Sequence, residues 1–505
     1  MSFLELRGIR KTYPGVLAND DISLHVEAGE IHGLVGENGA GKSTLMKLLY
    51  GMEQPDAGEI RLNGKRVMIA NPQDAIRLGI GMVHQHFQLV PSLTVAENIA
   101  LGAEPRYGPF LNRFRLRRQV QALSEQFGLQ VDPNALVSDL PVGLQQRVEI
   151  LKMLYRNARL LILDEPSAVL TPQEVESLFG VLRRLVAGGC TAIFITHKLY
   201  EIMALCTRAT VLRRGRVVGT VQTVDTTPSE IARLMVGHEV EAPVITEAPA
   251  DGRRRPRLEV RNLQITSGSR RATQIDLTVF GGEILGIAGV EGNGQQELVE
   301  ALIGVADGVS GEVLLDGESI TRVPTRTRRE RGLALIPEDR QTEGLSKAMA
   351  IWENLSAGDY YQQAQGLGVL PLGQMRAMAA GLLNRFDIRA TDERVGVGTL
   401  SGGNAQKVVI ARELMRDPSV LVAVQPTRGL DIGAAGFVQE QLLRLRGAGV
   451  GVLLISADLD ELLALSDRIA VLFNGRIVAQ FPRAAATREQ IGLAMAGKTM
   501  SENIL

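Results

Sequence analysis

Residues 31–49 constrain the fold most, because an apolar run, a glycine-rich loop and a helix-forming segment follow one another there. The run I-H-G-L-V ends at residue 35, the loop G-E-N-G-A-G-K-S spans residues 36–43, and T-L-M-K-L-L follows. The loop glycines let the backbone fold tightly around a phosphate chain and turn its N–H groups inward at a helix N-terminus. Strand, glycine loop and helix in this order predict an anion-binding loop.

The loop has the Walker A pattern of nucleotide-binding proteins. Lys42 can reach the outer phosphates as a point charge, and the Ser43 hydroxyl can ligate the Mg²⁺ that bridges them. The residues predicted to bind the nucleotide here are Gly36, Glu37, Asn38, Gly39, Ala40, Gly41, Lys42, Ser43 and Thr44. Eight residues alone could also form an ordinary glycine turn, so the interpretation depends on motifs farther along the chain.

Length and composition set broad bounds. At 505 residues the chain exceeds one ordinary core and indicates two to four domains. The formal net charge of -1 gives no overall basic field that would favour nucleic acid. Cys190 and Cys206 lack a C-x-x-C spacing and nearby histidine pairs, so we expect unlinked thiols and no zinc site. Neither a signal-peptide pattern nor a run of roughly 18 apolar residues occurs, which predicts a soluble, cytoplasmic chain.

A second motif supplies two carboxylates. The continuous apolar run at residues 160–163 ends in Asp164 and Glu165, as expected of a buried parallel strand that delivers acidic groups to its C-terminal edge. This is a Walker B pattern. We expect Asp164 to hold the metal, and Glu165 to orient and deprotonate the water that attacks the γ-phosphate.

Three further residues stand at the ends of predicted strands or beside them. Gln85 follows the apolar run at residues 79–83 and is placed to sense Mg²⁺ or the attacking water. His197 follows the run at residues 192–196 and could contact the γ-phosphate and stabilise charge in the transition state. Tyr13 precedes the Walker A strand, where it could stack on adenine, although a lone tyrosine more often only packs.

The chain contains an internal repeat. Residues 289–294 repeat the glycine loop after 253 residues (289 minus 36), and Leu400 repeats Leu140 after 260 residues. Between the copies, residues 239–257 contain prolines and no sustained apolar period, as an interdomain linker does. We therefore predict a tandem duplication, with a first domain at residues 1–239, a linker at 240–256 and a second domain at 257–505.

This order of motifs resembles the ATP-binding subunits of ABC transporters, in which a Walker A loop, a glutamine loop, an L-S-G-G-Q signature, a Walker B strand and a switch histidine follow one another. Residues 400–404 read L-S-G-G-N, so Asn404 departs from the usual glutamine. The resemblance covers essentially the whole chain. It implies an α/β fold of two tandem P-loop domains, each with a mixed or parallel sheet core, an antiparallel β subdomain and a helical subdomain.

Dimers of this family are head to tail, so each nucleotide lies between the Walker residues of one domain and the signature of the other. The resemblance thus implies one complete site, with ATP and Mg²⁺, made of Lys42, Ser43, Gln85, Asp164, Glu165 and His197 together with Ser401, Gly402, Gly403 and Asn404. The Ser401 side chain and the backbone N–H groups that follow it suit the γ-phosphate as a second anion cradle.

In the other site most of these groups are replaced. Gln295 replaces the lysine and Gln296 replaces the residue with the hydroxyl, while Glu338 occupies the position of the glutamine. Val424 and Gln425 replace the two carboxylates, and Ala457 replaces the histidine. The first-copy signature reads L-P-V-G-L, and Pro141 offers neither a hydroxyl nor an N–H. Glu291 would repel phosphate from the second loop. We therefore predict one hydrolytic site per chain, the alternative being a decayed second copy without a role.

The sequence Q-P-T-R-G-L-D at residues 425–431 resembles the energy-coupling subunits of bacterial simple-sugar and nucleoside importers. V-H-Q-H-F at residues 83–87 and the missing second Walker B carboxylates favour the nucleoside branch. The alternatives are import of a simple sugar such as ribose or galactose, or of an autoinducer-like sugar derivative. A ribosome- or nucleic-acid-associated tandem ABC ATPase is disfavoured by the incomplete site, the short linker and the near-zero charge.

The resemblance also implies partners and a location. We expect two integral membrane permease subunits, an extracytoplasmic solute-binding protein, a peripheral position on the cytoplasmic face of the inner membrane, and no nucleic acid. Residues 86–110 would receive a coupling helix of the permease. The arginine-rich stretch at residues 112–127 is a solvated face or a contact with a partner or with anionic lipid heads.

Overall fold

A computed structural model describes residues 2–84, 87–107, 110–167, 170, 172–237, 255–267, 270–290, 292–364 and 368–497. The chain divides into two compact units, Met1–Val240 and Glu241–Leu505. The predicted linker, residues 240–256, lies almost wholly outside the described residues, and the first strand of the second unit begins at Pro256.

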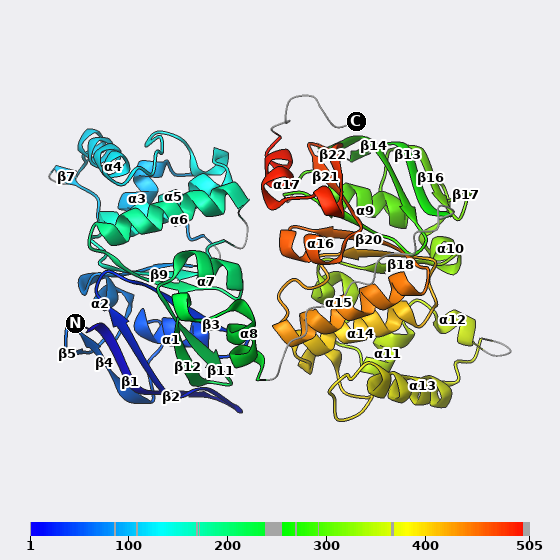
Figure 1. The fold of residues 1–505 in the computed structure, drawn as a ribbon, viewed down its shortest axis with the longest axis horizontal. Coiled ribbons are helices and arrows are strands. Elements are labelled where there is room, and N and C mark those ends of the chain that lie inside the picture. The colour runs from blue at the N-terminus through cyan, green and yellow to red at the C-terminus, as the bar shows by residue number, and fades with distance from the viewer. Residues whose placement is uncertain are drawn as a thin grey trace. The chain divides into compact units, whose positions relative to one another are not determined.

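The first unit contains two main sheets (Figure 1). An antiparallel sheet has the order β2-β1-β4-β5, with β1 Ser2–Tyr13, β2 Val16–Glu27, β4 Ala57–Leu62 and β5 Lys65–Val67. A six-stranded sheet has the order β12-β11-β3-β10-β9-β6, with β3 Ile31–Gly36, β6 Ile80–Val83, β9 Leu160–Asp164, β10 Thr191–Ile195, β11 Arg208–Arg213 and β12 Arg216–Gln222. Its strands are parallel except β12, which pairs antiparallel with β11.

The helices of this unit are α1 Lys42–Leu49, α2 Pro72–Arg77, α3 Val95–Ala100, α4 Arg113–Phe127, α5 Val142–Tyr155, α6 Pro172–Ala187, α7 Leu199–Leu205 and α8 Pro228–Val236, with 3-10 turns at Val137–Asp139 and Thr223–Asp225. A short hairpin pairs β7 Arg106–Tyr107 with β8 Phe110–Leu111. Helix α1 packs against β2 and β3, between the two sheets, whereas α3, α4, α5 and α6 contact one another on the other side of the six-stranded sheet (Figure 1). Every residue of β3, β9 and β10 is buried, as unbroken apolar runs predict for central parallel strands.

The second unit repeats this plan. Its antiparallel sheet has the order β14-β13-β16-β17, with β13 Pro256–Ser267, β14 Arg270–Phe280, β16 Val309–Leu315 and β17 Glu318–Ser319. Its six-stranded sheet has the order β18-β19-β20-β15-β21-β22, with β15 Ile284–Ala288, β18 Leu333–Ile336, β19 Val420–Val424, β20 Gly451–Ser456, β21 Arg468–Phe473 and β22 Arg476–Pro482. Again only the edge strand β22 runs antiparallel to its neighbour.

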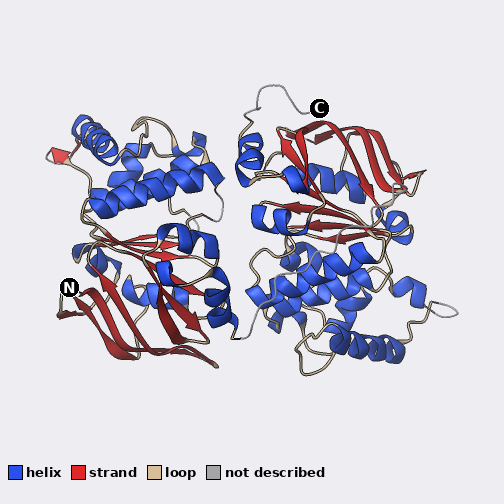
Figure 2. Ribbon diagram, in the orientation of Figure 1, coloured by secondary structure: helices blue, strands red, loops and turns tan. Residues whose placement is uncertain are grey.

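Its helices are α9 Gln295–Ile303, α10 Thr325–Glu330, α11 Ile351–Ser356, α12 Tyr360–Gln363, α13 Leu372–Arg385, α14 Gly402–Leu414, α15 Ile432–Gly447, α16 Leu459–Leu465 and α17 Arg488–Met495. Short 3-10 turns lie at Val397–Thr399 and Arg483–Ala485, and a π-helical turn, η3, spans Arg340–Gly344. Figure 2 shows the same layering of sheets and helices in each unit. The predicted fold class, with an antiparallel subdomain and a helical subdomain in each copy, is confirmed.

None of the helices in the described part of the chain has the length and apolar character that crossing a membrane requires. Both cysteines are free thiols, as expected.

Candidate nucleotide-binding site

The glycine loop joins β3 to α1, and two of its glycines are required by space. A Cβ on Gly36 would lie 2.3 Å from the carbonyl oxygen of Leu212 in β11. Gly41, which caps α1 with a φ of 100°, would place a Cβ 2.4 Å from the carbonyl oxygen of Ala18 in β2. Because both neighbours are backbone, neither position can accept a side chain without moving a strand.

Asn19 in β2 holds this loop, and the sequence motifs gave no indication of it. Its side chain is fully buried and its Nδ2 donates to the carbonyl oxygen of Gly41 at 3.1 Å. Its Oδ1 is also buried and has no hydrogen-bond partner among the described residues. The sequence signal was a polar residue on the inward face of the strand, which is otherwise formed by Ile22, Leu24 and Val26.

Lys42 is folded back over the loop. Its Nζ donates to the carbonyl oxygens of Gly36 at 2.6 Å and Glu37 at 3.0 Å, and only 6% of the residue is exposed. Burial lowers the pKa of the ammonium, and the charges of Glu165 and Asp164 partly offset this effect. The direct hydrogen-bond acceptors of this cation are neutral carbonyls, and negatively charged phosphate oxygens can replace them with stronger, charge-assisted hydrogen bonds.

Asp164 ends β9 and meets the start of α1. The hydroxyl of Ser43 donates a hydrogen bond to its carboxylate. Burial, reinforced by the charge of Glu165, raises the pKa of Asp164, and the Ser43 hydrogen bond and the charge of Lys42 act in the opposite direction. A hydroxyl beside a carboxylate is the kind of oxygen pair that Mg²⁺ accepts when phosphates and water complete its shell. No cluster of three or more His, Cys, Asp or Glu suited to a metal occurs among the described residues.

Glu165 and His197 form the other half of the site. Glu165 turns out of β9 with a φ of 47°, and its N–H donates to the carbonyl oxygen of Ile195 at 3.0 Å. Its Oε1 lies 3.0 Å from Nδ1 of His197. Burial raises the pKa of Glu165, but the hydrogen bond and charge of His197 and the charge of Lys42 outweigh it, so that pKa lies below its ordinary value. An ionised carboxylate only accepts, so Nδ1 of His197 carries the proton and donates it.

The structure therefore brings Lys42, Ser43, Asp164, Glu165 and His197 together at the C-terminal ends of β3, β9 and β10. Tyr13 lies at the end of β1, opposite Val16, with Lys11 Nζ 5.5 Å from its ring centroid. Its contact with adenine stays a prediction. Gln85 and Glu291 lie outside the described residues.

The loop of the second unit is closed by its own side chains. Gln295 begins α9 as Lys42 begins α1, and its Nε2 donates to the carbonyl oxygen of Val290 at 2.9 Å. Its Oε1 accepts from the backbone N–H of Asn293 at 3.1 Å. Val290 stands at the position of Glu37, so a neutral amide replaces the hydrogen bond of the lysine and adds one to a loop N–H.

The other predicted replacements in the second unit also affect individual side chains and leave the strands in place. β19 ends at the buried Val424, and Gln425 turns out of the strand with a φ of 46°, as Glu165 does. The backbone N–H of Ala457 donates to Oε1 of Gln425 at 3.3 Å, in place of the carboxylate–imidazole pair. Glu338 forms an ion pair with Arg428. The positions equivalent to Asp164, Glu165 and His197, at the ends of β19 and β20, thus hold neither a carboxylate nor an imidazole.

The signature of the second unit begins a helix. α14 starts at Gly402 with Ser401 as its cap, and the Ser401 Oγ accepts from the backbone N–H of Asn404 at 3.4 Å and from its Nδ2 at 3.0 Å. Oδ1 of Asn404 accepts from the N–H of Arg389 at 2.9 Å. Ser401 is exposed, and the first turn of α14 is half-buried.

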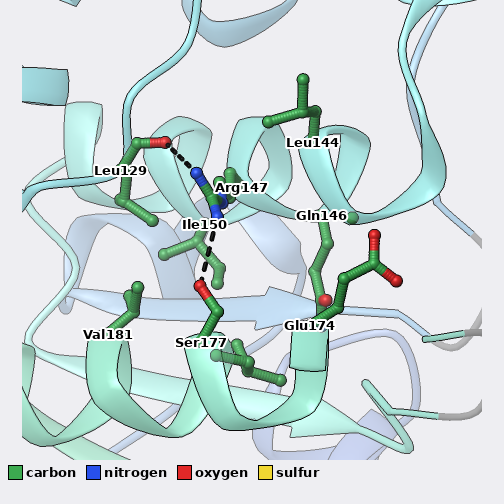
Figure 3. Close-up of a pocket in the computed structure, with 10 residues that line it drawn as sticks. Leu129, Leu144, Gln146, Arg147, Ile150, Glu174, Ser177 and Val181 are labelled. Atoms are coloured by element: carbon green, nitrogen blue, oxygen red, sulfur yellow. Dashed lines mark hydrogen bonds between the residues drawn. The ribbon is translucent and has the colours of Figure 1, made fainter. Parts of the chain in front are cut away.

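The altered signature of the first unit is built differently. α5 follows Pro141, which provides no side-chain cap. The carboxylate of Glu174 lies against the first turn of α5, where a Cβ on Gly143 would be 2.3 Å from its Oε1 (Figure 3). In the second unit the position of Glu174 is occupied by Ala434. A negative charge at this helix N-terminus opposes the binding of a phosphate there.

A small cavity of about 70 Å³ lies beside this turn, between α5 and α6 (Figure 3). Arg147 crosses it and donates to the carbonyl oxygen of Leu129 at 3.4 Å and to Oγ of Ser177 at 3.1 Å. In the second unit the position of Ser177 is Phe437, whose ring centroid lies 4.8 Å from Lys407 Nζ. Ser177, which lines the cavity, is thus smaller than its counterpart in the second unit.

A Walker A loop, a Walker B carboxylate and a repeated α/β core define a tandem P-loop nucleotide hydrolase. The sequence model of the ABC transporter family matches residues 19–168 and 272–428. The chain therefore belongs to the ABC transporter family, as an ATP-binding ATPase subunit of the importer type. The prediction of this family and of ATPase activity is confirmed.

Three known relatives match over at least 96% of their length. The guanosine import ATP-binding protein NupO of Bacillus subtilis is 47% identical, covering 99% of this chain and 98% of the relative. The glucose import ATP-binding protein TsgD13 of Haloferax volcanii is also 47% identical, covering 98% and 96%. The nucleoside import ATP-binding protein NupA of Lactococcus lactis is 43% identical, covering 99% of both chains.

Proposed function

We propose that this chain is the ATP-hydrolysing, energy-coupling subunit of a nucleoside importer, with one competent ATP site per chain. The names of NupO and NupA support a nucleoside as the imported solute, and so do the V-H-Q-H-F and Q-P-T-R-G-L-D sequences. Import of a simple sugar is the second candidate, because TsgD13 is as similar as NupO. The two domains extend over residues 1–239 and 257–505, joined by a linker at 240–256.

The proposed site combines Lys42, Ser43, Gln85, Asp164, Glu165 and His197 of the first unit with Ser401, Gly402, Gly403 and Asn404 of the second, and with Tyr13 beside the adenine. The observation that supports this site is that the intact Walker residues lie in one unit and the intact signature helix lies in the other. The first unit has the buried lysine and the Glu165–His197 pair but a carboxylate against its signature helix. The second unit has a serine-capped signature helix but a self-closed loop.

Within this site each residue has a chemical role. Glu165, held ionised by His197, accepts the proton of the attacking water, and Lys42 exchanges its loop carbonyls for phosphate oxygens. Ser43 and Asp164, with Gln85, would hold Mg²⁺, which neutralises the charge that develops on the phosphate oxygens. ATP binding closes the two halves and hydrolysis reopens them.

Two permease subunits and an extracytoplasmic solute-binding protein complete the proposed transporter, with this chain peripheral on the cytoplasmic face of the inner membrane. Import ATP-binding proteins work with permeases and binding proteins in general, which supports this composition.

The test is ATP turnover of the full chain with its membrane partners, for the wild type, Glu165→Gln, Ser401→Arg and Pro141→Arg. Glu165→Gln and Ser401→Arg are each expected to abolish turnover. Pro141→Arg is the matched control, because it places the same side chain in the altered signature, and it should leave turnover unchanged. An active Ser401→Arg variant, or a dead Pro141→Arg variant, would refute the crosswise site. Stimulation of turnover by binding protein loaded with a nucleoside, but not with a pentose or hexose, tests the cargo.

A further inference from the structure

The segment that follows β18 in the second unit is attached to both ends of the signature helix. Its π-helical turn η3 is capped by Asp339, whose Oδ1 accepts from the N–H of Gln341 at 2.7 Å and of Thr342 at 3.3 Å. At the end of the turn, the carbonyl oxygen of Gly344 accepts from Nη1 of Arg412, near the C-terminus of α14, at 2.8 Å. At its start, Arg340 reaches the first turn of α14.

The guanidinium of Arg340 is wedged between the start of the signature helix and the turn after β19. Its Nη1 donates to the carbonyl oxygen of Arg428 at 2.8 Å. Its Nη2 lies 2.8 Å from the place where a Cβ on Gly402 would be, and 3.7 Å from the same place on Gly429. Its Nε is buried and has no hydrogen-bond partner among the described residues. The missing side chain of Gly402 is therefore what admits the arginine.

The first unit has no such wedge at the equivalent position. Counting from the ends of β6 and β18, Arg340 corresponds to Phe87. The arginine thus accompanies the signature that keeps Ser401, and the phenylalanine accompanies the signature with Pro141. β6 and β18 occupy the same place in their sheets, but the π-helical turn that carries Arg340 has no counterpart at residues 87–90 of the first unit.

We propose that Arg340 is a positioning residue of the ATP site. Its Nη1 is held by the carbonyl oxygen of Arg428 while its Nη2 packs against Gly402 in the first turn of α14. This packing keeps Ser401 and the N–H groups of Gly402 and Gly403 in one orientation toward the γ-phosphate. This rests on the proposed crosswise site. Lysine cannot reproduce this arrangement, because an ammonium lacks the second nitrogen that lies against Gly402 while the first donates to the carbonyl oxygen of Arg428.

The experiment compares the wild type with Arg340→Ala and Arg340→Lys as full chains with their membrane partners. Both substitutions are expected to lower kcat by about 10-fold or more, the order of effect that misplacement of a reacting group produces. The affinity for a non-hydrolysable ATP analogue should stay within about twofold, because Lys42 and the rest of the Walker A loop belong to the other unit. Added methylguanidinium should restore part of the turnover of Arg340→Ala only.

Arg444→Ala is the matched control, since Arg444 forms an exposed ion pair with Glu440 at 2.7 Å on α15 of the same unit. It should change neither kcat nor melting temperature. If Ser401→Arg abolishes turnover while Arg340→Ala and Arg340→Lys retain full kcat, the positioning role is wrong and the crosswise site stands. If the Ser401→Arg variant is active, both the crosswise site and the positioning role of Arg340 are wrong. A loss of turnover that follows a lower melting temperature, or that methylguanidinium does not relieve, would make Arg340 a folding residue and overturn the proposal.

Discussion

Glu461 provides a prediction whose size follows from the structure. It lies on α16 in the second unit with 3% of its surface exposed, and its Oε1 accepts from the hydroxyl of Thr427 at 2.8 Å. Burial, with the nearby charge of Asp458, raises the pKa of Glu461 to about 7, and hydrogen bonds from Ser456 and Thr427 only partly oppose this. The ordinary value for glutamate is 4.5.

Between these two pKa values the folded state binds the proton more tightly than the unfolded chain does. The free energy of unfolding therefore falls as pH rises from 4.5 to about 7, and stays at its lower level above that. At roughly 1.4 kcal/mol for each pKa unit, the total loss is about 3 kcal/mol. Glutamine keeps the acceptor for Thr427 but does not ionise, so Glu461→Gln removes the loss.

The assay is chemical unfolding of the full chain at pH 5 and pH 8, following the transition of the second unit. Relative to the wild type, Glu461→Gln should gain about 2 to 3 kcal/mol more at pH 8 than at pH 5. Glu201→Gln is the matched control and is followed by the transition of the first unit. Glu201 is also buried but has Lys198 Nζ at 4.0 Å, so this substitution should not stabilise that unit. An equal change at both pH values for Glu461→Gln would refute the reasoning.

Two further substitutions test the loop and the signature. Asn19→Ala leaves a buried carbonyl without its donor, so we expect a loss of about 1–3 kcal/mol in stability and weaker ATP binding, measured by titration with a fluorescent nucleotide. Unchanged affinity would contradict the role given to Asn19. Gly403→Ala would bring a Cβ within 2.8 Å of the Cβ of Ala434, and overpacking of this kind costs about 1–3 kcal/mol, so turnover should fall. Gly143→Ala, in the altered signature, should leave turnover unchanged.

Features encoded by neighbouring residues were accessible from the sequence. The Walker A loop lies within eight positions, and the apolar run of β9 delivers Asp164 and Glu165 to the sheet edge without any long-range information. The repeat then predicted the second fold, because the same pattern of strands and helices recurs at a nearly constant spacing. The sequence also assigned Glu165 and His197 to one site, but their direct pairing was found only in the structure.

Contacts between distant segments were not accessible in this way. The bond from Asn19 to Gly41 joins β2 to the loop, and one asparagine in a strand carries no pattern that reveals it. Glu174 reaches α5 from a separate helix, so its position against Gly143 depends on how the two helices pack. The sequence showed that Gln295 replaces a lysine, but it could not show that the amide closes the loop.

The two loops also explain how the second unit keeps its fold without the chemistry of the first. Lys42 is buried with carbonyl oxygens as its hydrogen-bond acceptors, and a buried cation gains stability when an anion arrives. Gln295 satisfies the carbonyl of Val290 and the N–H of Asn293 with no charge, so an anion brings no comparable gain. We therefore expect ATP to stabilise the first loop more than the second. That difference is what a chain requires if one unit senses the nucleotide and the other presents a fixed signature helix to it.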